Sequence, residues 1–253
     1  QAGVAAKDVI LKLCGDFGVM GFNYQVIEYA GSAVRAMSVD ERMTLANMAA
    51  ELGGKTGIVE PDEKTEAQLS AWGAVGIYIA AWKNDPGATF ARTVVLDGDA
   101  LVPQVAAPSS PENAAPVTDH LGTKLDQAYL GACTGAKLDD LRMAAAVLNG
   151  RQIPKGFKFM VAPSSVKIRE QAAKEGTLGI IEAAGGVVLA TGCGGCIGQG
   201  AARLEENAVG ISSTNRNFVG RAGPRSSKLY LASPFTVAAS AIVAYASQVL
   251  TGR

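Results

Sequence analysis

Apolar and polar positions alternate along the chain with helical spacing in some segments and strand spacing in others. In the first part, the pattern predicts a helix at residues 4–17 that ends at glycines. Ser38 and Glu41 are spaced as a capping box, so we expect a second helix from there to about residue 52. The other elements predicted in this part are strands at 21–29, 56–59 and 91–96 and a helix at 66–75.

Beyond residue 116 the pattern becomes an alternation of strands and helices. It predicts strands at 127–131, 157–161, 186–190, 208–212 and 228–231, with helices at 138–148, 166–174, 177–183 and from Pro234 onward. Strands that alternate with helices predict a mainly parallel sheet covered on both faces, an α/β fold. Residues 103–116 contain four prolines, which predicts a linker. We therefore divide the chain into domains 1–106 and 107–253.

Composition narrows the class of protein. The 253 residues are 48% hydrophobic, which supports a substantial core, and 23 basic residues balance 23 acidic ones. Without a run of one charge sign, we expect neither a nucleic-acid partner nor binding to a membrane surface. The apolar stretch at 235–250 is short for a membrane span and contains Ser240, Ser247 and Gln248, so a buried helix is expected there.

The start of the chain and the number of cysteines both indicate the cellular compartment. The start lacks a basic-then-apolar signal pattern, and four cysteines do not resemble a secreted disulfide framework, so we expect a reducing, cytoplasmic setting. Residue 1 is glutamine rather than methionine, and a processed chain or a piece of a longer protein is therefore expected.

The candidate chemistry lies in glycine-rich segments that contain cysteine. Cys193 and Cys196 form a C-x-x-C pair in Gly-Cys-Gly-Gly-Cys, and Cys133 follows a predicted strand in Gly-Ala-Cys-Thr-Gly. Three thiolates suit an iron–sulfur cluster with one open iron, or an incomplete zinc site. Taken alone, the C-x-x-C pair also fits a zinc pair or a redox dithiol. Cys14 lies in an apolar helical pattern and is expected to be a buried core thiol.

Several motifs, in order along the chain, resemble the aconitase superfamily, most closely the large subunits of isopropylmalate isomerase and their hydro-lyase relatives. They are Thr-Leu-Ala-Asn-Met-Ala-Ala-Glu at 44–51, Gly-Ala-Cys-Thr at 131–134, Gly-Cys-Gly-Gly-Cys at 192–196, Ser-Thr-Asn-Arg-Asn-Phe-Val-Gly-Arg at 213–221 and Ala-Ser-Pro at 232–234. The resemblance implies two aconitase-type, three-layer α/β/α domains, the second and third of a four-domain enzyme. It also implies a cytoplasmic hydro-lyase of leucine biosynthesis.

The resemblance also implies roles for individual residues. Cys133, Cys193 and Cys196 match the ligands of a [4Fe–4S] cluster whose fourth iron binds substrate as a Lewis acid. Asn47 and Glu51 match catalytic positions near the iron-bound oxygen. The residues that match carboxylate-binding positions are Asn215, Arg216 and Arg221. Two guanidinium groups suit a di- or tricarboxylate, because each can pair with a carboxylate through two hydrogen bonds.

The chain departs from the family pattern in two respects. The family usually has Cys-Thr-Asn-Gly-Arg where this chain has Cys-Thr-Gly-Ala-Lys at 133–137, so a polar side chain beside the cluster is absent. The family's aspartate–histidine motifs are not found, and His120 matches none of them; we expect it to be a surface residue. The resemblance therefore implies an N-terminal segment and a small swivelling-domain subunit as partners, with a small hydroxy acid as substrate.

Two other functions remain open on the sequence. A non-catalytic metal-binding or redox module would use Cys193 and Cys196 alone. An assembly subunit would have kept the fold and lost catalysis. The hydroxy acid itself is left open by these motifs.

Overall fold

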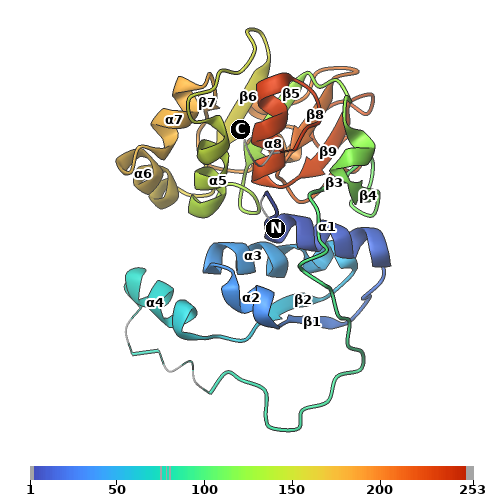
Figure 1. Cartoon of the computed structure of the whole chain (residues 1–253), viewed down its shortest axis with the longest axis vertical. Coiled ribbons are helices and arrows are strands. Elements are labelled where there is room, and N and C mark those ends of the chain that lie inside the picture. The colour runs from blue at the N-terminus through green and yellow to red at the C-terminus, as the bar shows by residue number, and fades with distance from the viewer. Residues whose placement is uncertain (1–2, 75, 78, 80, 249–253) are drawn as a thin grey trace.

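Two β-sheets, each with its own helices, make up the structure (Figure 1). The computed structural model describes residues 3–248 except 75, 78 and 80. The helices are α1 (Ala6–Phe17), α2 (Ser32–Ala36), α3 (Val39–Met48), α4 (Glu63–Ala71), α5 (Leu138–Leu148), α6 (Val166–Lys174), α7 (Thr177–Ala183) and α8 (Pro234–Val243). Short 3₁₀ helices are η1 (Ala49–Leu52), η2 (Val117–His120), η3 (Gly194–Ile197) and η4 (Gly200–Ala202).

The larger sheet has seven strands in the order β4-β3-β9-β8-β5-β6-β7, and the smaller sheet has two, β1 and β2. The strands are β1 (Val26–Tyr29), β2 (Thr56–Val59), β3 (Gln104–Ala106), β4 (Ala114–Pro116), β5 (Gln127–Gly131), β6 (Lys158–Ala162), β7 (Val187–Val188), β8 (Val209–Ser212) and β9 (Lys228–Ala232). Strands β5 to β9 run parallel, whereas β3 is antiparallel to both β4 and β9. The expected α/β fold with mainly parallel sheets is confirmed.

Alternate residues of the seven-stranded sheet pack into different cores. In β5, Ala128 and Leu130 join the core formed with α5, α7 and α8, while Tyr129 packs with Cys196 on the opposite face. In β9, Leu229 and Leu231 pack with α1 on that opposite face. The period of two in a strand thus places α5–α8 on one face and α1 with the cysteine loop on the other.

Helix α1 is shared between the two sheets. Ile10, Leu11 and Cys14 have no exposed surface, and their core includes residues of β3 and β9 as well as Leu45 of α3 and Leu52 of η1. In Figure 1, α1 lies between the upper, seven-stranded part and the lower part that contains α2–α4. The helix therefore joins the two parts into one apolar core.

The smaller sheet packs closely under α3. Strand β1 pairs with β2 in parallel, from Val26 opposite Thr56 to Tyr29 opposite Val59. A Cβ atom on Gly57 would lie 2.8 Å from the Cα of Ala46, so glycine permits the helix to approach the strand. This close contact fixes how far α3 and η1 lie from the smaller sheet. These two helices contain Asn47 and Glu51.

Two expectations from the sequence were wrong. Residues 91–96 form no strand; they belong to an extended segment that loops away after α4 and returns to β3 (Figure 1). Their apolar alternation lacks a neighbouring strand to pair with, and a single strand leaves its backbone groups unpaired. Residues 103–116, expected to be a linker, contain the antiparallel pair β3–β4 at the sheet edge. Proline is tolerated there because an edge strand needs fewer N–H donors.

Other expectations were closer. The helix expected at 66–75 is α4, although residue 75 itself lies outside the described residues. His120 is half-buried rather than on the surface, with its ring centroid 5.8 Å from that of Tyr230. The domain boundary after residue 106 stays a prediction, and β3, just before it, pairs within the seven-stranded sheet.

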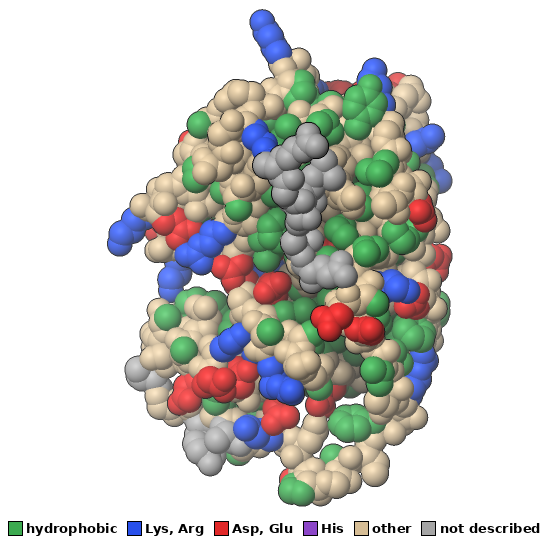
Figure 2. Space-filling view, viewed as in Figure 1, with side chains coloured by type: hydrophobic (Ala, Val, Ile, Leu, Met, Phe, Trp, Pro, Cys, Tyr) green, Lys and Arg blue, Asp and Glu red, His purple; other side chains and the backbone are tan. Residues whose placement is uncertain are grey.

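The surface agrees with a balanced charge. On the face in Figure 2, acidic and basic side chains are interspersed over both parts of the molecule. Among the described residues, no helix combines the length and the apolar character needed to cross a bilayer.

Replacing Phe159 by Ala should lower the free energy of unfolding by about 3–5 kcal/mol, because its ring fills the core under α5 and α7. Phe159 in β6 is 1% exposed. Val166→Ala is the control: that side chain is 60% exposed, so a change within about 0.5 kcal/mol is expected. Urea denaturation measures both, and equal midpoints would contradict the assigned core.

Candidate active site

Asn47 and Glu51 come from one helical segment that changes pitch between them. Ser38 caps α3: its Oγ accepts from the N–H of Glu41 at 3.2 Å, and the Glu41 carboxylate accepts from the N–H of Ser38 at 3.2 Å. The segment continues as η1 and ends at Gly53, whose φ of 83° suits glycine. Both side chains point toward the residues that follow β5 and β8.

Asn47 is exposed and lies beside the first cysteine. Its Nδ2 is 3.9 Å from the Sγ of Cys133, and its Oδ1 accepts a hydrogen bond from the Thr134 hydroxyl at 2.9 Å. The hydroxyl donor fixes which side of the amide faces the sulfur. The amide donor is therefore directed at the thiol, where it can stabilise a thiolate or a ligand oxygen.

Glu51 is a buried carboxylate with one oxygen left unpaired. Its side chain is 1% exposed. Oε1 accepts from the Nε of Arg216 at 2.5 Å and from the Nδ2 of Asn215 at 3.3 Å, whereas Oε2 is buried without a hydrogen-bond partner. Buried polar atoms are normally paired, and an unpaired one costs about 1–3 kcal/mol.

The cysteines follow β5 and β7. Cys133 and Cys193 are exposed, while Cys196 is buried in η3, and its N–H bonds to the carbonyl oxygen of Cys193 at 2.7 Å. A Cβ atom on Gly195 would lie 2.7 Å from that of Ala202, so the glycine lets the cysteine turn pack against η4. The Tyr129 hydroxyl donates to the Cys193 carbonyl oxygen at 3.2 Å and ties this turn to β5.

Cys196 contacts two residues of the segment after β8. Its Sγ is 3.9 Å from Oδ1 of Asn215 and 3.9 Å from Nη2 of Arg221. Burial raises the pKa of the Cys196 thiol above its ordinary value, and the guanidinium of Arg221 acts in the opposite direction. The Nε of Arg221 is buried without a partner. An anion next to this pair would satisfy that donor.

The segment after β8 is held to the backbone of β5 and of the loop after it through its own Ser213 side chain. The Ser213 hydroxyl donates to the carbonyl oxygens of Gly131 and Gly135 at 3.2 and 2.9 Å and accepts from the N–H of Gly131 at 3.0 Å. A Cβ atom on Gly135 would lie 2.4 Å from the Ser213 side chain. A side chain at 135 would collide there, so the close contact with Ser213 requires glycine at this position.

The predicted site residues lie in two sets of contacts, which the α3–η1 segment joins. Asn47 touches the segment after β5, Glu51 touches the segment after β8, and that segment touches Cys196. Cys193 joins through the backbone of its own turn. The residues brought together are Asn47, Glu51, Cys133, Cys193, Cys196, Asn215, Arg216 and Arg221. In the part of the chain described, no group of three His, Cys, Asp or Glu side chains is arranged to hold a single metal ion.

Cys14 lies outside this set and is a core thiol, as expected. It has no exposed surface, and its Sγ is 4.0 Å from the carbonyl oxygen of Glu51. Burial raises the pKa of this thiol to about 12. A neutral thiol in an apolar core behaves as a small hydrophobic group.

Two buried lysines beside the site were missed on the sequence. Lys137 Nζ donates to Thr44 Oγ1, to the Thr134 carbonyl oxygen and to Asp140, at 2.7–2.8 Å, and so connects α3 with the Cys133 loop. Lys7 of α1 reaches the carbonyl oxygens of Ser213 and Thr214. Lysine usually lies at the surface of a protein. The only signal in the sequence was therefore a lysine among apolar residues.

A match to a known protein family covers nearly the whole chain. Residues 1–244 match the aconitase family (aconitate hydratase), and the chain therefore belongs to this family. The resemblance inferred from the motifs is confirmed.

The relatives are large subunits. The 3-isopropylmalate dehydratase large subunit 2 of Archaeoglobus fulgidus is 42% identical over 243 residues, which are 96% of this chain and 58% of the relative. The large subunit 1 of Methanopyrus kandleri is 43% identical over 95% of this chain and 57% of the relative. The methanogen homoaconitase large subunit of Methanocaldococcus jannaschii is 41% identical over 96% and 59%. The chain thus spans somewhat over half the length of these relatives.

In cluster-free protein, an alkylating reagent should modify Cys133 and Cys193 much faster than Cys14, because only an accessible thiolate reacts. Peptide mass mapping after short labelling gives the order. The same labelling in denaturant, where all four thiols should react, is the control. Labelling of Cys14 as fast as Cys193 in the folded protein would contradict the burial described.

Proposed function

We propose that this chain forms part of the large subunit of an iron–sulfur hydro-lyase, which removes and re-adds water on a hydroxy-di- or tricarboxylate. The main observation is the contact network that joins Cys196, a buried carboxylate with an unpaired oxygen, and two arginines, while Cys133 lies beside Asn47 of the same helical segment as that carboxylate. Names of relatives support it, since they include 3-isopropylmalate dehydratase and homoaconitase large subunits.

A [4Fe–4S] cluster fits the residues present. Cys133, Cys193 and Cys196 are soft ligands of the type that iron–sulfur clusters use, and each thiolate of a cluster binds a different iron. Two buried atoms lack partners: Nε of Arg221, whose guanidinium contacts Cys196, and Oε2 of Glu51, whose other oxygen is linked to Cys196 through Asn215. When bound, the cluster would supply a Lewis acid through the iron that has no protein thiolate.

Glu51 and Asn47 would handle the hydroxyl group of the substrate. The unpaired Oε2 of Glu51 can accept a hydrogen bond from a hydroxyl or exchange a proton with it, while Oε1 is held by Arg216. The amide of Asn47 is fixed by Thr134 and can donate to an oxygen beside Cys133. Both groups come from the α3–η1 segment, which gives them a fixed spacing.

Arg216 and Arg221 would bind the substrate carboxylates. The side chain of Arg216 is 39% exposed, with Nε used by Glu51, so the outer part of its guanidinium can meet a carboxylate. Arg221 has a buried Nε without a partner beside Cys196. Asn215, between Glu51 and Cys196, would add an amide to the same carboxylate site.

The complete enzyme would need further parts. The resemblance implies an N-terminal segment and a small swivelling-domain subunit that supplies a serine base and another arginine. General acid–base groups typically contribute about 10²–10⁴-fold in rate, so we expect no turnover from this chain by itself. The assay therefore combines the chain with both parts.

Two other functions remain as alternatives. A zinc-binding or redox module would use the Cys193–Cys196 pair, and an assembly subunit would keep the fold without catalysis. The side chains near Cys196 favour the hydro-lyase, because neither alternative requires Arg221 at the thiol together with a second arginine of the same segment paired to a buried carboxylate.

Cluster binding should depend on Cys193 and not on Cys14. After anaerobic reconstitution, Cys193→Ser should lose most of the visible absorption and bound iron, whereas Cys14→Ser should match the unmodified chain, because Cys14 lies in the core. Equal iron in the two variants would refute the cluster site. Stoichiometric zinc in the protein as isolated would favour the metal-binding alternative.

In the assembled enzyme, Arg216→Lys and Arg221→Lys should each cost at least about 1–3 kcal/mol in kcat/KM, since lysine keeps the charge and loses the planar pair of donors. Arg225→Lys is the control, because Arg225 is exposed in the same segment. Steady-state kinetics with isopropylmalate and its dehydrated form measure the effect. Unchanged kcat/KM in both site variants would disprove the assignment.

A further inference from the structure

Lys7 is a buried charge that the proposed chemistry does not use. It is the second residue of α1, and only 2% of it is exposed. Removing an ammonium group from water is costly unless it is paired and hydrogen-bonded. Its contacts should therefore reveal what it does in this fold.

The ammonium group of Lys7 reaches the segment that contains the proposed carboxylate-binding residues. Nζ donates to the carbonyl oxygens of Ser213 and Thr214, which follow directly after β8. The next two residues are Asn215 and Arg216, whose side chains both bind Oε1 of Glu51. The lysine thus holds the main chain immediately before the two side chains that meet the carboxylate.

Other contacts hold the same segment from the side of the sheet. The Ser213 hydroxyl binds the carbonyl oxygens of Gly131 and Gly135, and the Ser212 hydroxyl accepts from the N–H of Thr214 at 3.0 Å. The Ser213 contacts tie the segment to β5 and the loop after it, and the Ser212 contact fixes the turn within the segment. Lys7 adds an anchor from α1, which also packs against η1, where Glu51 lies. Helix α1 therefore contacts both η1, which contains Glu51, and the segment that contains the two partners of Glu51, Asn215 and Arg216.

The charge of Lys7 is suited to this position. Burial lowers its pKa to about 8, and the nearby carboxylate of Glu51 acts in the opposite direction. The group therefore still carries its charge at neutral pH. Lys137 disfavours the charge, while Asp140 favours it.

We propose that Lys7 is a positioning residue for the segment 213–217: its ammonium group holds two successive carbonyl oxygens so that Asn215 and Arg216 face Glu51. The effect on substrate binding rests on the function proposed above, whereas the effect on the segment does not. Without the ammonium group, both carbonyl oxygens lose their charged donor, and the segment can move away from η1.

The adjacent residue offers a matched control. Asp8 is also buried on α1, and its carboxylate accepts from the N–H groups of Ala5 and Gln104, both at 2.8 Å. It anchors the same helix to β3, and within the described part of the chain no hydrogen bond joins it to residues 213–217. Asp8→Asn should therefore disturb α1 without releasing the segment.

The first test is amide hydrogen exchange on the cluster-free chain. Lys7→Met should speed exchange in peptides that cover 211–219 by about tenfold or more, the scale of one lost hydrogen bond to a charged group, while Asp8→Asn leaves them unchanged. Lys7→Gln keeps one donor and should lie between. The proposal is overturned if Lys7→Met leaves these peptides unchanged, if exchange rises equally throughout the chain, or if both Lys7 variants fail to fold while Asp8→Asn folds.

The second test uses the assembled enzyme. Lys7→Met should raise KM for the hydroxy acid by about tenfold or more, a larger effect than on kcat, because the binding segment is displaced. Asp8→Asn should leave KM as it is. A lower kcat with unchanged KM would count against positioning. If unmodified assembled enzyme shows no turnover, the proposed function fails, and hydrogen exchange alone decides the role of Lys7.

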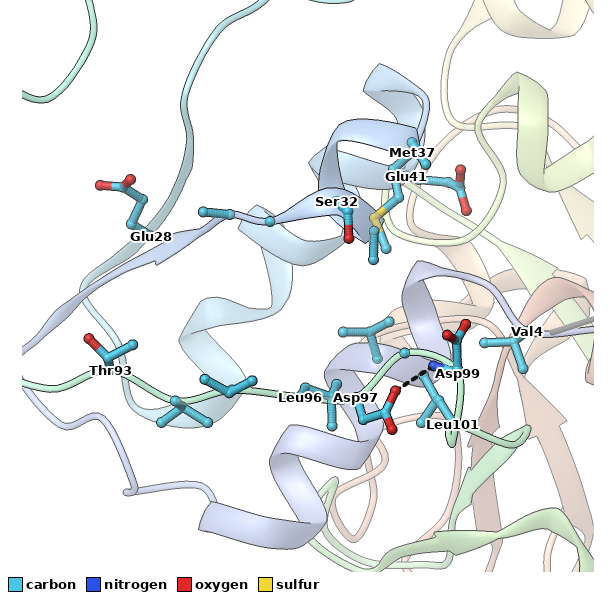
Figure 3. A pocket seen from close by; sticks show the side chains of 18 of the residues that line it. Val4, Glu28, Ser32, Met37, Glu41, Thr93, Leu96, Asp97, Asp99 and Leu101 are labelled. Carbon is cyan, nitrogen blue, oxygen red and sulfur yellow. Dashed lines mark hydrogen bonds between the residues drawn. The ribbon is translucent and has the colours of Figure 1, made fainter.

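A further cavity lies away from residues 213–217. It has a volume of about 1010 Å³ and lies between β1, α2 and the segment 90–101, where Glu28, Glu41, Asp97 and Asp99 are among its lining residues (Figure 3). Carboxylates alone do not define a ligand.

Discussion

Helix α1 has to be covered on more than one side. Its buried apolar residues cover one broad face, while Lys12, Gly15 and Asp16 are accessible to solvent, and so broad an apolar face needs more than one partner to cover it. The seven-stranded sheet covers one side through Leu229 and Leu231, and α3 with η1 covers the other through Leu45 and Leu52. Full burial of one such side chain contributes about 1.5–3 kcal/mol, so enclosing the helix favours the association of the two sheets.

The same enclosed layer contains charged groups that are costly to bury. Lys7, Asp8, Glu51, Lys137 and Asp140 each have at most 5% of their surface exposed. Such groups need specific partners, and a single arrangement satisfies most of them. Lys137 donates three hydrogen bonds across the layer, and its partners come from both α3 and the Cys133 loop. The apolar contacts hold the two parts together, whereas the charged contacts define how they are oriented.

The sequence predicted best those elements whose pattern is local. The bounds of β2, β5, α5, α6 and α7 agree with the predicted ranges because their caps and glycines are encoded within a few residues. Strand pairing is a long-range property, and the alternation at 91–96 could not reveal that no neighbouring strand exists there. The pair β3–β4 was hidden for the same reason, because its prolines suggested a linker while β9, far along the chain, provides its partner.

Some of the site residues could likewise be recognised from local sequence, whereas others depend on long-range contacts. Cys133, Cys193 and Cys196 stand out because glycines surround them at strand ends, and the arginines stand out within a family motif. The buried lysines could not be predicted, since their partners are mainly backbone carbonyl oxygens that any sequence would provide. Which oxygen of Glu51 remains unpaired likewise depends on the three-dimensional contacts of Arg216 and Asn215.

Because the site is divided between two parts that share α1, it exists only in molecules where both parts are docked. When a binding-competent state is fractionally populated, the apparent affinity falls by that fraction. A substitution at Leu11, which touches no proposed site residue through a hydrogen bond, would reduce the docked population. Every ligand of the site would then be weakened by one common factor, and the ranking among ligands would stay the same. The choice among ligands is thus controlled by the site residues, whereas the fraction of molecules able to bind any ligand is controlled by the apolar core around α1.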